Sequence, residues 1–221
     1  PLTNIKGYSP RISPDGKYVT FSGEGSFGGD AYICRLEENA NAVKIASPGY
    51  DPHWIKSNEN EFLYLIYSDK GGKVRFGSGK TFKQKIKRSD LSKVGNPEEI
   101  TFEGSSSHMA GGVSKNGRYY CTGYPDAVMY DTKENVKYSF DGGQKCNPSM
   151  STMSDIENRM MFLNGNHTSF TIGTGDNGKE ETKTYNVGDC QNPEWSTHEN
   201  YMTYVKKQGG CGDLIAFRLS V

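Results

Sequence analysis

Short runs of apolar and aromatic residues, each about five residues long and each preceded by a turn, recur along the whole chain. The clearest runs are residues 18–22, 62–67, 119–124, 160–163 and 201–205. Aromatic, β-branched and long apolar residues in runs of this length are typical of β-strands. No stretch keeps an apolar period of 3.6 residues, so the pattern predicts an all-β protein with little or no helix.

An anchor segment of similar composition precedes each run: a proline or small residue, a variable residue, a large apolar residue and usually a polar one. The five anchors are Pro10-Arg11-Ile12-Ser13, Pro52-His53-Trp54-Ile55, Gly111-Gly112-Val113-Ser114, Pro148-Ser149-Met150-Ser151 and Pro193-Glu194-Trp195-Ser196. Asp15-Gly16 follows the first anchor and Asn116-Gly117 follows the third. Both dipeptides signal a tight turn that needs positive φ. The chain is therefore built from five repeats.

The anchors recur at intervals of about 40 residues, with one longer interval before Gly111, which is the repeat length of four-stranded propeller blades. The sequence predicts a single domain, residues 1–221, folded as a five-bladed β-propeller of four-stranded antiparallel blades. The approximate blades are residues 8–47, 48–103, 104–142, 143–188 and 189–221. The last repeat is short, so we expect the N-terminal strand, within residues 1–7, to complete the last blade and to cover its open edge.

The first repeat carries a family resemblance. Ser9-Pro10-Arg11-Ile12-Ser13-Pro14-Asp15-Gly16-Lys17-Tyr18 resembles the P-x-W-S-P-D-G-K repeat of TolB-like, PD40-type (WD40-like) β-propellers. Trp54 and Trp195 stand at the Trp position of that repeat, whereas Ile12, Val113 and Met150 depart from it. The resemblance implies an extracytoplasmic bacterial protein, secreted or periplasmic, in a superfamily whose members act in polysaccharide use, protein assembly or peptidase gating.

The amino-acid composition limits the classes of partner that we expect for this protein. Lys and Arg together number 26, as do Asp and Glu, so the formal net charge is zero and no overall field favours nucleic acid. No apolar run approaches the roughly 20 residues of a membrane-spanning helix. The first residue is Pro1 and no signal peptide precedes it, so we expect a processed or excised piece, either a monomer or part of a larger chain.

Polar and aromatic residues near the anchors are the candidate ligand-binding groups, because the loops that enter the first strands should gather at one end of the propeller channel. They are His53, His108, Asn147, Asn192, Glu194, Tyr50 and Tyr124. Amide, imidazole and carboxylate groups bond hydroxyls, and tyrosine rings stack on sugars. The alternative is that Asn147 and Asn192, each before a proline, only cap turns. Trp54 and Trp195 share a repeat position, which favours packing between blades.

No cofactor is predicted. A divalent metal at the channel stays an alternative, because His53 and His108 begin neighbouring blades, although no metal-binding motif accompanies them. The five cysteines include no C-x-x-C pair. A disulfide between Cys146 and Cys190 and buried free thiols are both compatible with the sequence. Residues 70–88 carry eight basic residues and no acid, which suits either a phosphate or acidic-sugar site or a solvated hairpin.

These observations favour an extracytoplasmic carbohydrate-binding or protein-interaction module that recognises a polysaccharide or an extracellular protein. One alternative is a carbohydrate-active enzyme, either a metal-assisted polysaccharide lyase or a glycoside hydrolase. The other is a structural interaction domain of a larger secreted protein. No catalytic residue is assigned, because no carboxylate pair or serine nucleophile motif stands out.

Overall fold

A computed structural model describes most of the chain. The described residues are 7–13, 15–23, 29–55, 59–69, 79–100, 112–122, 127–140, 146–151, 158–176, 179–195, 201–208 and 211–219. They form strands, turns and no helix, so the all-β prediction is confirmed. The chain divides into two compact units, Pro1–Ser107 and His108–Val221, which are described separately. That the chain is one domain stays a prediction.

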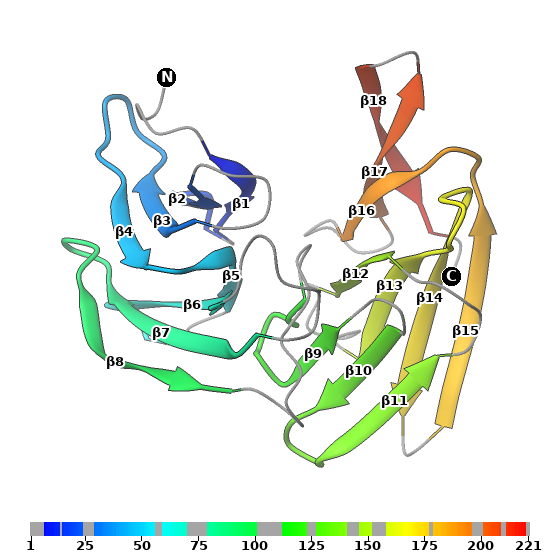
Figure 1. The fold of residues 1–221 in the computed structure, drawn as a ribbon, viewed down its shortest axis with the longest axis horizontal. Helices are drawn as coiled ribbons and strands as arrows, with labels where there is room; N and C mark the ends of the chain where they lie inside the picture. The colour runs from blue at the N-terminus through cyan, green and yellow to red at the C-terminus, as the bar shows by residue number, and fades with distance from the viewer. Residues whose placement is uncertain are drawn as a thin grey trace. The chain divides into compact units, whose positions relative to one another are not determined.

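The first unit contains two four-stranded antiparallel sheets (Figure 1). The first has the order β1-β2-β3-β4, with β1 (Tyr8–Ile12), β2 (Tyr18–Ser22), β3 (Ala31–Arg35) and β4 (Val43–Ala46). The second has the order β5-β6-β7-β8, with β5 (Tyr50–Ile55), β6 (Phe62–Ser68), β7 (Thr81–Lys87) and β8 (Lys93–Glu99).

The second unit contains three antiparallel sheets. The third sheet comprises β9 (Tyr119–Thr122), β10 (Ala127–Asp131) and β11 (Val136–Phe140). The fourth comprises β12 (Cys146–Met150), β13 (Arg159–Leu163), β14 (Ser169–Asp176) and β15 (Lys179–Asn186). The fifth comprises β16 (Gln191–Trp195), β17 (Tyr201–Gln208) and β18 (Cys211–Arg218).

Five antiparallel sheets that follow one another along the chain give the fold class of a five-bladed β-propeller, as predicted. Three of the sheets have four strands. In the third sheet, the place of a fourth strand is taken by a single bridge between Val113 and Tyr120. The strand expected to complete the last sheet falls on residues 1–6, which lie outside the described residues.

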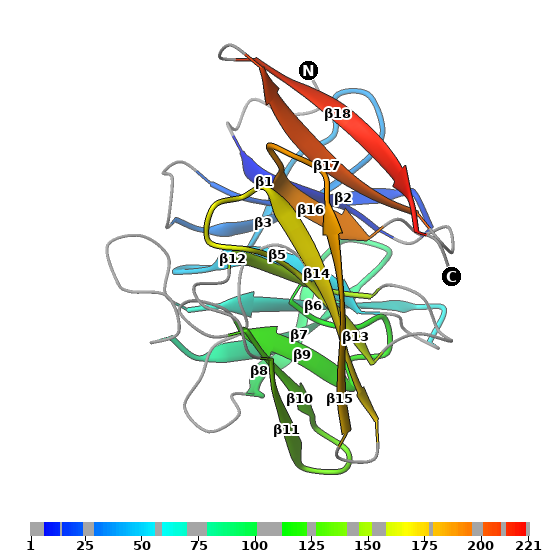
Figure 2. The same cartoon turned by 90° about the vertical axis from the view of Figure 1, so that its right-hand side faces the viewer.

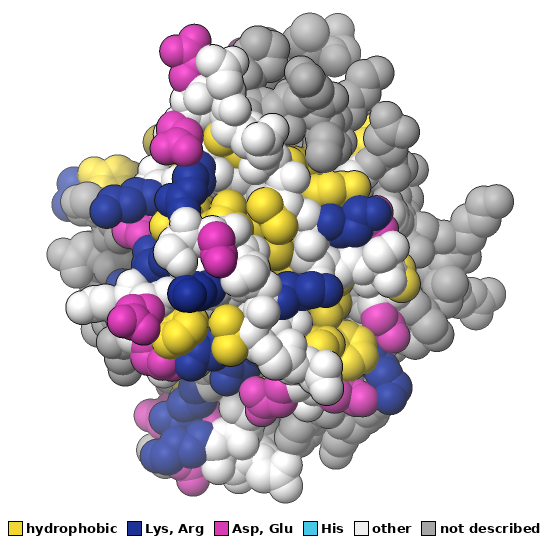
Figure 3. All heavy atoms as spheres, turned by 90° about the vertical axis from the view of Figure 1, so that its left-hand side faces the viewer, with side chains coloured by type: hydrophobic (Ala, Val, Ile, Leu, Met, Phe, Trp, Pro, Cys, Tyr) yellow, Lys and Arg dark blue, Asp and Glu magenta, His cyan; other side chains and the backbone are white. Residues whose placement is uncertain are grey.

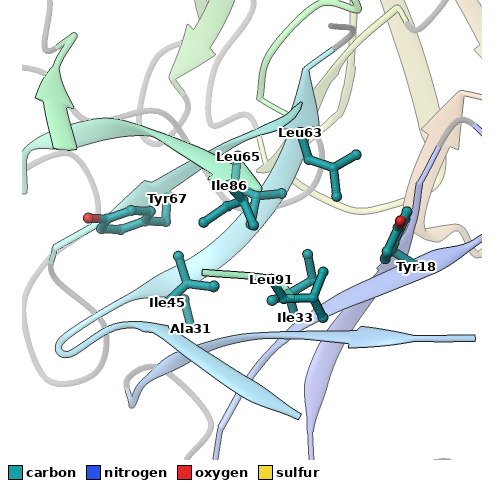
Figure 4. Close-up of a cluster of buried hydrophobic side chains, with 9 residues drawn as sticks. All are labelled: Tyr18, Ala31, Ile33, Ile45, Leu63, Leu65, Tyr67, Ile86 and Leu91. Carbon is teal, nitrogen blue, oxygen red and sulfur yellow. The ribbon is translucent and has the colours of Figure 1, made fainter. Parts of the chain in front are cut away.

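Successive sheets within each unit pack face to face. Leu63 and Leu65 of β6 alternate with outward residues and meet Ile33 and Ile45 of the first sheet in one buried cluster (Figure 4). A second cluster joins the third sheet to the fourth, and a third joins the fourth to the fifth. Period-two alternation therefore gives each sheet an apolar face for its neighbour.

The two clear repeats form the same hairpin. Ser13 Oγ donates to Asp15 Oδ1 and accepts the N–H of Tyr18, at 2.6 and 3.0 Å. Ser114 makes the corresponding bonds with Asn116 and Tyr119, both at 3.0 Å. The glycine that follows the Asp or Asn has φ of 71° in the first hairpin and 77° in the second. The serine of the anchor and the Asp/Asn-Gly pair thus fix the turn together.

Candidate functional site

A β-bulge recurs in the first strand of a sheet, always at a residue followed by proline. Ser9, Asp51 and Asn147 have φ of 51°, 48° and 47°. At each of them the pairing of the first strand with the second shifts register. The strand β16 shows the same shift between Gln191 and Glu194, around the Asn192–Pro193 bond. The bulge is therefore part of the repeat.

A left-handed backbone conformation before proline costs conformational free energy. Left-handed φ is uncommon outside glycine, although Asn and Asp adopt it more readily than most residues. The residue before proline is also restricted to extended conformations by the proline ring. A bulge leaves one residue out of the ladder and redirects its side chain, and such irregularities concentrate beside functional sites. These side chains are accordingly where a site on this fold is expected.

In the first unit the bulge holds a buried charged cluster. Asp51 is 3% exposed, and its Oδ2 lies 3.0 Å from Nε2 of His53, which is 4% exposed. This distance is that of a hydrogen bond between the carboxyl and the imidazole. On the other side, the guanidinium of Arg11 lies 3.9 Å from Asp51 Oδ1. The carboxylate therefore links β1 to β5.

Two polar residues of β2 hold the same bulge from the neighbouring sheet. The backbone N–H of Asp51 donates to Ser22 Oγ at 2.9 Å, and Thr20 Oγ1 donates to the carbonyl of Pro52 at 2.9 Å. Both donors and acceptors are buried. Buried backbone groups need hydrogen-bond partners. Thr20 and Ser22 therefore provide the hydrogen bonds that the interrupted β5–β6 ladder does not make.

Tyr50 lies next to this cluster and is 9% exposed. Burial raises the pKa of its hydroxyl well above the ordinary value, the charge of Asp51 raises it further, and Arg11 opposes the change. The phenol is therefore neutral in the folded protein. Because Tyr50 and His53 are buried, any part they play in binding is to position the bulge rather than to offer a ring face to a ligand.

The other predicted site residues lie either on first strands of the second unit or outside the described residues. Asn147 and Glu194 lie half-buried on the first strands β12 and β16, which pack against each other. Asn192 lies on β16, but its side chain, like His108 and Tyr124 as a whole, falls outside the described residues. That these residues form one ligand site with His53 and Tyr50 stays a prediction.

Sequence reasoning missed Arg11 and Asp51. Asp51 stands immediately before the anchor proline, at the position of Ser9 and Asn147, so its place in the repeat was a usable signal. Arg11 gave no such signal, because it is the variable residue of its anchor and becomes a partner of Asp51 only through the packing of β1 near β5.

The two tryptophans connect neighbouring sheets. Trp54 Nε1 donates to the carbonyl of Arg11 at 2.9 Å, and Trp195 Nε1 donates to the carbonyl of Ser149 at 3.0 Å. Arg11 and Ser149 both follow the anchor proline of the preceding sheet of their unit. The prediction that these indoles pack between blades is confirmed.

Most basic residues in the described part of the basic segment pair with an acid. Lys80 pairs with Glu99 at 2.8 Å and Lys85 pairs with Glu59 at 2.8 Å. Arg88 pairs with Asp15 at 2.7 Å. Lys, Arg, Asp and Glu side chains are interspersed on the face seen in Figure 3. Lys83 pairs with Glu98 at 3.5 Å, so four of the five basic residues in 79–88 have an acidic partner. Residues 70–78 lie outside the described part, and the choice between a binding site and a solvated hairpin stays a prediction.

Cys34, Cys121 and Cys190 are buried free thiols, so Cys190 is not joined to Cys146 here. Within the described ranges, no group of three or more His, Cys, Asp or Glu side chains is placed to hold a metal ion. The part of the chain that the structure describes also lacks any helix long and apolar enough to cross a membrane.

No protein-family model matches the sequence, and no curated protein matches it significantly. Solved structures, in contrast, do match this chain. A putative TolB from Agrobacterium tumefaciens is 19% identical, with a TM-score of 0.58 over 92% of this chain and 71% of that one. TolB from Acinetobacter baumannii is 17% identical, with a TM-score of 0.54 over 86% of this chain and 46% of that one. The chain therefore has the β-propeller fold of the TolB proteins, and the resemblance inferred from its repeats is confirmed at the level of the fold.

Proposed function

We propose that the chain is the binding module of an extracytoplasmic protein and recognises a polypeptide partner at the bulged first strands of its sheets. The observation that carries this proposal is the bulge itself. Its backbone is nearly the same at Ser9, Asp51 and Asn147, while the side chain differs at each place. A constant strained backbone with a varied polar side chain suits recognition, because the half-buried Ser9 and Asn147 can present different groups from equivalent positions, while the buried Asp51 supports its bulge from within.

The exposed surface of β1 favours a polypeptide over a sugar. Tyr8 is 48% exposed and Ile12 is 65% exposed, and the two lie on either side of the bulge at Ser9. Isoleucine offers no flat ring for stacking and no group for a sugar hydroxyl. Exposed apolar side chains on both sides of a polar bulge residue are instead the composition of a protein interface.

The extracytoplasmic location rests on the resemblance to TolB-like propellers and on the two bacterial TolB structures that share the fold. The chain spans less than half of the Acinetobacter baumannii TolB chain, so it also fits as one module of a larger protein.

The test uses two probes on the same immobilised chain: a displayed library of random 12-residue peptides and a glycan array. The proposal expects enriched peptides whose binding falls at least fivefold in Asn147→Gly. Glycine keeps the left-handed backbone and removes only the amide. Asn39→Gly is the matched control, because Asn39 also has positive φ, at 58°, but lies in an exposed turn away from the bulges.

Three results contradict the proposal. A glycan that binds while no peptide is enriched identifies a polysaccharide module. Release of unsaturated or reducing sugar ends from a polysaccharide panel identifies a carbohydrate-active enzyme. Equal loss of peptide binding in Asn147→Gly and Asn39→Gly moves the binding surface away from the bulges.

A further inference from the structure

The outer edges of the sheets differ in how well they are protected against pairing with another chain. An edge strand leaves a row of backbone N–H and C=O groups available, and proteins shorten, interrupt or cover such rows. The strand β4 has only four residues. The strand β8 contains Pro97, has Gly95 at φ of 69°, and shifts register against β7. On β11, Glu180 accepts the N–H of Ser139 at 2.6 Å.

The strand β15 is neither short nor interrupted, and charged side chains are its protection against pairing. It runs for eight residues, contains no Gly or Pro, and pairs with β14 in one uninterrupted register from Ser169↔Asn186 to Asp176↔Lys179. Every residue of β15 except Tyr185 is exposed. Figure 1 shows β15 as the outermost strand of its sheet, and Figure 2 shows it lengthwise beside β14. The remaining long edge, β18, is the one that residues 1–7 are expected to cover.

The charges on β15 are arranged by face. Side chains alternate along a strand, so Lys179, Glu181, Lys183 and Tyr185 share one face. Glu180 lies on the other face, where it reaches Ser139 of β11. On the first face, Lys183 Nζ lies 5.3 Å from the centre of the Tyr185 ring. One face of an exposed edge thus carries positive, negative, positive and aromatic side chains in order.

We propose that β15 is a dimerisation edge, which pairs antiparallel with β15 of a second copy of this chain about a two-fold axis at Thr182. Two-fold antiparallel pairing keeps each face continuous across the contact, so residues opposite each other come from the same face. An axis at Thr182 places Glu181 of each copy opposite Lys183 of the other. It also places Lys179 of each copy opposite Tyr185 of the other, whose ring is stacked on Phe170 within its own chain, so this second pair brings no like charges together.

Neighbouring registers are disfavoured by the same charges. An axis at Glu181 sets Glu181 against its own copy and Lys179 against Lys183. An axis at Lys183 sets the two Lys183 side chains against each other. Like charges directly opposite each other destabilise a strand pair. An axis at Thr184 makes no ion pair and joins only residues 182–186. The charge order therefore specifies both the partner, a second copy, and the register, whereas the sequence led us to expect a monomer or part of a larger chain.

Charge reversal tests the contact on the whole chain. The molar mass measured by sedimentation velocity should rise with concentration toward that of a dimer. Glu181→Lys and Lys183→Glu should each weaken dimerisation at least tenfold, because each sets like charges opposite each other. The double variant Glu181→Lys/Lys183→Glu should restore it, since the pairs re-form with exchanged signs. Lys93→Glu on β8 is the control, because it reverses the sign of one exposed edge residue away from β15.

Cross-linking tests the register. Thr182→Cys should form a disulfide between two copies under mild oxidation, since the axis sets residue 182 opposite itself within reach of an S–S bond. Thr184→Cys should not, because Thr184 then lies opposite Glu180. A monomer at all concentrations, a dimer insensitive to both single reversals, or more cross-linking through residue 184 than 182 overturns the proposal. A cross-link through Leu214→Cys with none through residue 182 assigns the contact to β18 instead.

Discussion

The indole N–H of Trp54 donates to the main-chain carbonyl of Arg11 at 2.9 Å, across the contact between the first and second sheets. Trp195 makes the same bond to Ser149 between the fourth and fifth. The acceptor in each case is the residue after the anchor proline, where pairing with the second strand resumes beyond the bulge. The tryptophan therefore adds a hydrogen bond between sheets directly beside the bulge of the preceding sheet.

Removing the indole N–H should destabilise the protein at both positions. Trp195→Phe keeps most of the ring packing and leaves the Ser149 carbonyl without its donor, so we expect a loss of about 1–3 kcal/mol in the free energy of unfolding. Trp54→Phe should cost less, because the Trp54–Arg11 bond is only partly buried whereas the Trp195–Ser149 bond is buried. Urea unfolding measures both; a larger loss for Trp54→Phe would contradict this account.

The bulge at Asn147 should tolerate glycine and reject β-branched residues. With φ at 47°, Asn147→Gly should change the free energy of unfolding by less than about 1 kcal/mol, while Asn147→Val should cost about 2 kcal/mol. Thermal unfolding of the two variants measures this difference in stability. If valine were as well tolerated as glycine, the left-handed backbone at this position would not be a constraint.

The contact between the third and fourth sheets should be sensitive to one methyl group. A Cβ added at Gly173 would meet Phe140 Cε1 at 2.6 Å, and one added at Gly175 would meet Tyr138 Cγ at 2.5 Å. Each Gly→Ala change should cost about 1–3 kcal/mol, since overpacking forces side chains and strands apart. Thr174→Ala, between them on the opposite face, is the control. Chemical denaturation should show both glycine variants below it in stability.

Asp131 should make stability depend on pH in the acid range. Burial by itself raises the pKa of this carboxyl, but hydrogen bonds from Arg118 and from the backbone of Glu134 and Lys133 outweigh burial and hold the pKa below its ordinary value. The stabilisation is then complete above the unfolded pKa of about 3.9 and is lost as pH falls through the lower folded value.

Asp131→Asn should therefore cost about 2 kcal/mol at pH 7, and its difference from the native chain should shrink below about pH 4. Urea unfolding at pH 7 and pH 3 measures the difference. Asp176→Asn is the control, because Asp176 is an exposed carboxyl at the end of β14. If Asp131→Asn lowered the free energy of unfolding equally at both pH values, the charge of Asp131 would not be what stabilises the folded protein.

The described cysteines should be inert in the folded protein. Burial raises the pKa of Cys190 to about 12, with a further contribution from Asp189, and burial also raises the pKa of Cys34. Because the thiolate is the reactive form, iodoacetamide at pH 7.5 should label neither until urea unfolds the chain. Peptide mass mapping reads out each site. Labelling of Cys34 or Cys190 in the native protein would contradict their burial.

The local parts of the fold were predictable from sequence, and the long-range parts were not. Asp15-Gly16 and Asn116-Gly117 predicted their hairpins because the serine, the Asp or Asn and the glycine act within a few residues of one another. The shared position of Trp54 and Trp195 predicted their common role. The pairing of Arg11 with Asp51 was not predictable, because it joins strands 40 residues apart and depends on how two sheets pack.

The candidate site also has features that were predictable from the sequence and features that were not. The X-Pro signal identified Asn147 and Asn192 as special positions, yet offered turn capping as the alternative and gave no indication that His53 and Tyr50 would be buried. Burial depends on the side chains of the neighbouring sheet, here Ser22 and Thr20, which no motif connects to the anchor at Pro52.

Among the described strands, every ladder joins two strands that are neighbours along the chain. No sheet has to wait for a distant segment before its described strands can pair, so the entropy of closing large loops opposes only the packing of one sheet on the next. A ribosome delivering this chain would release complete hairpins one after another, each able to form before its successor exists. Assembly should then proceed in the direction of synthesis, with the later sheets docking onto a preformed surface.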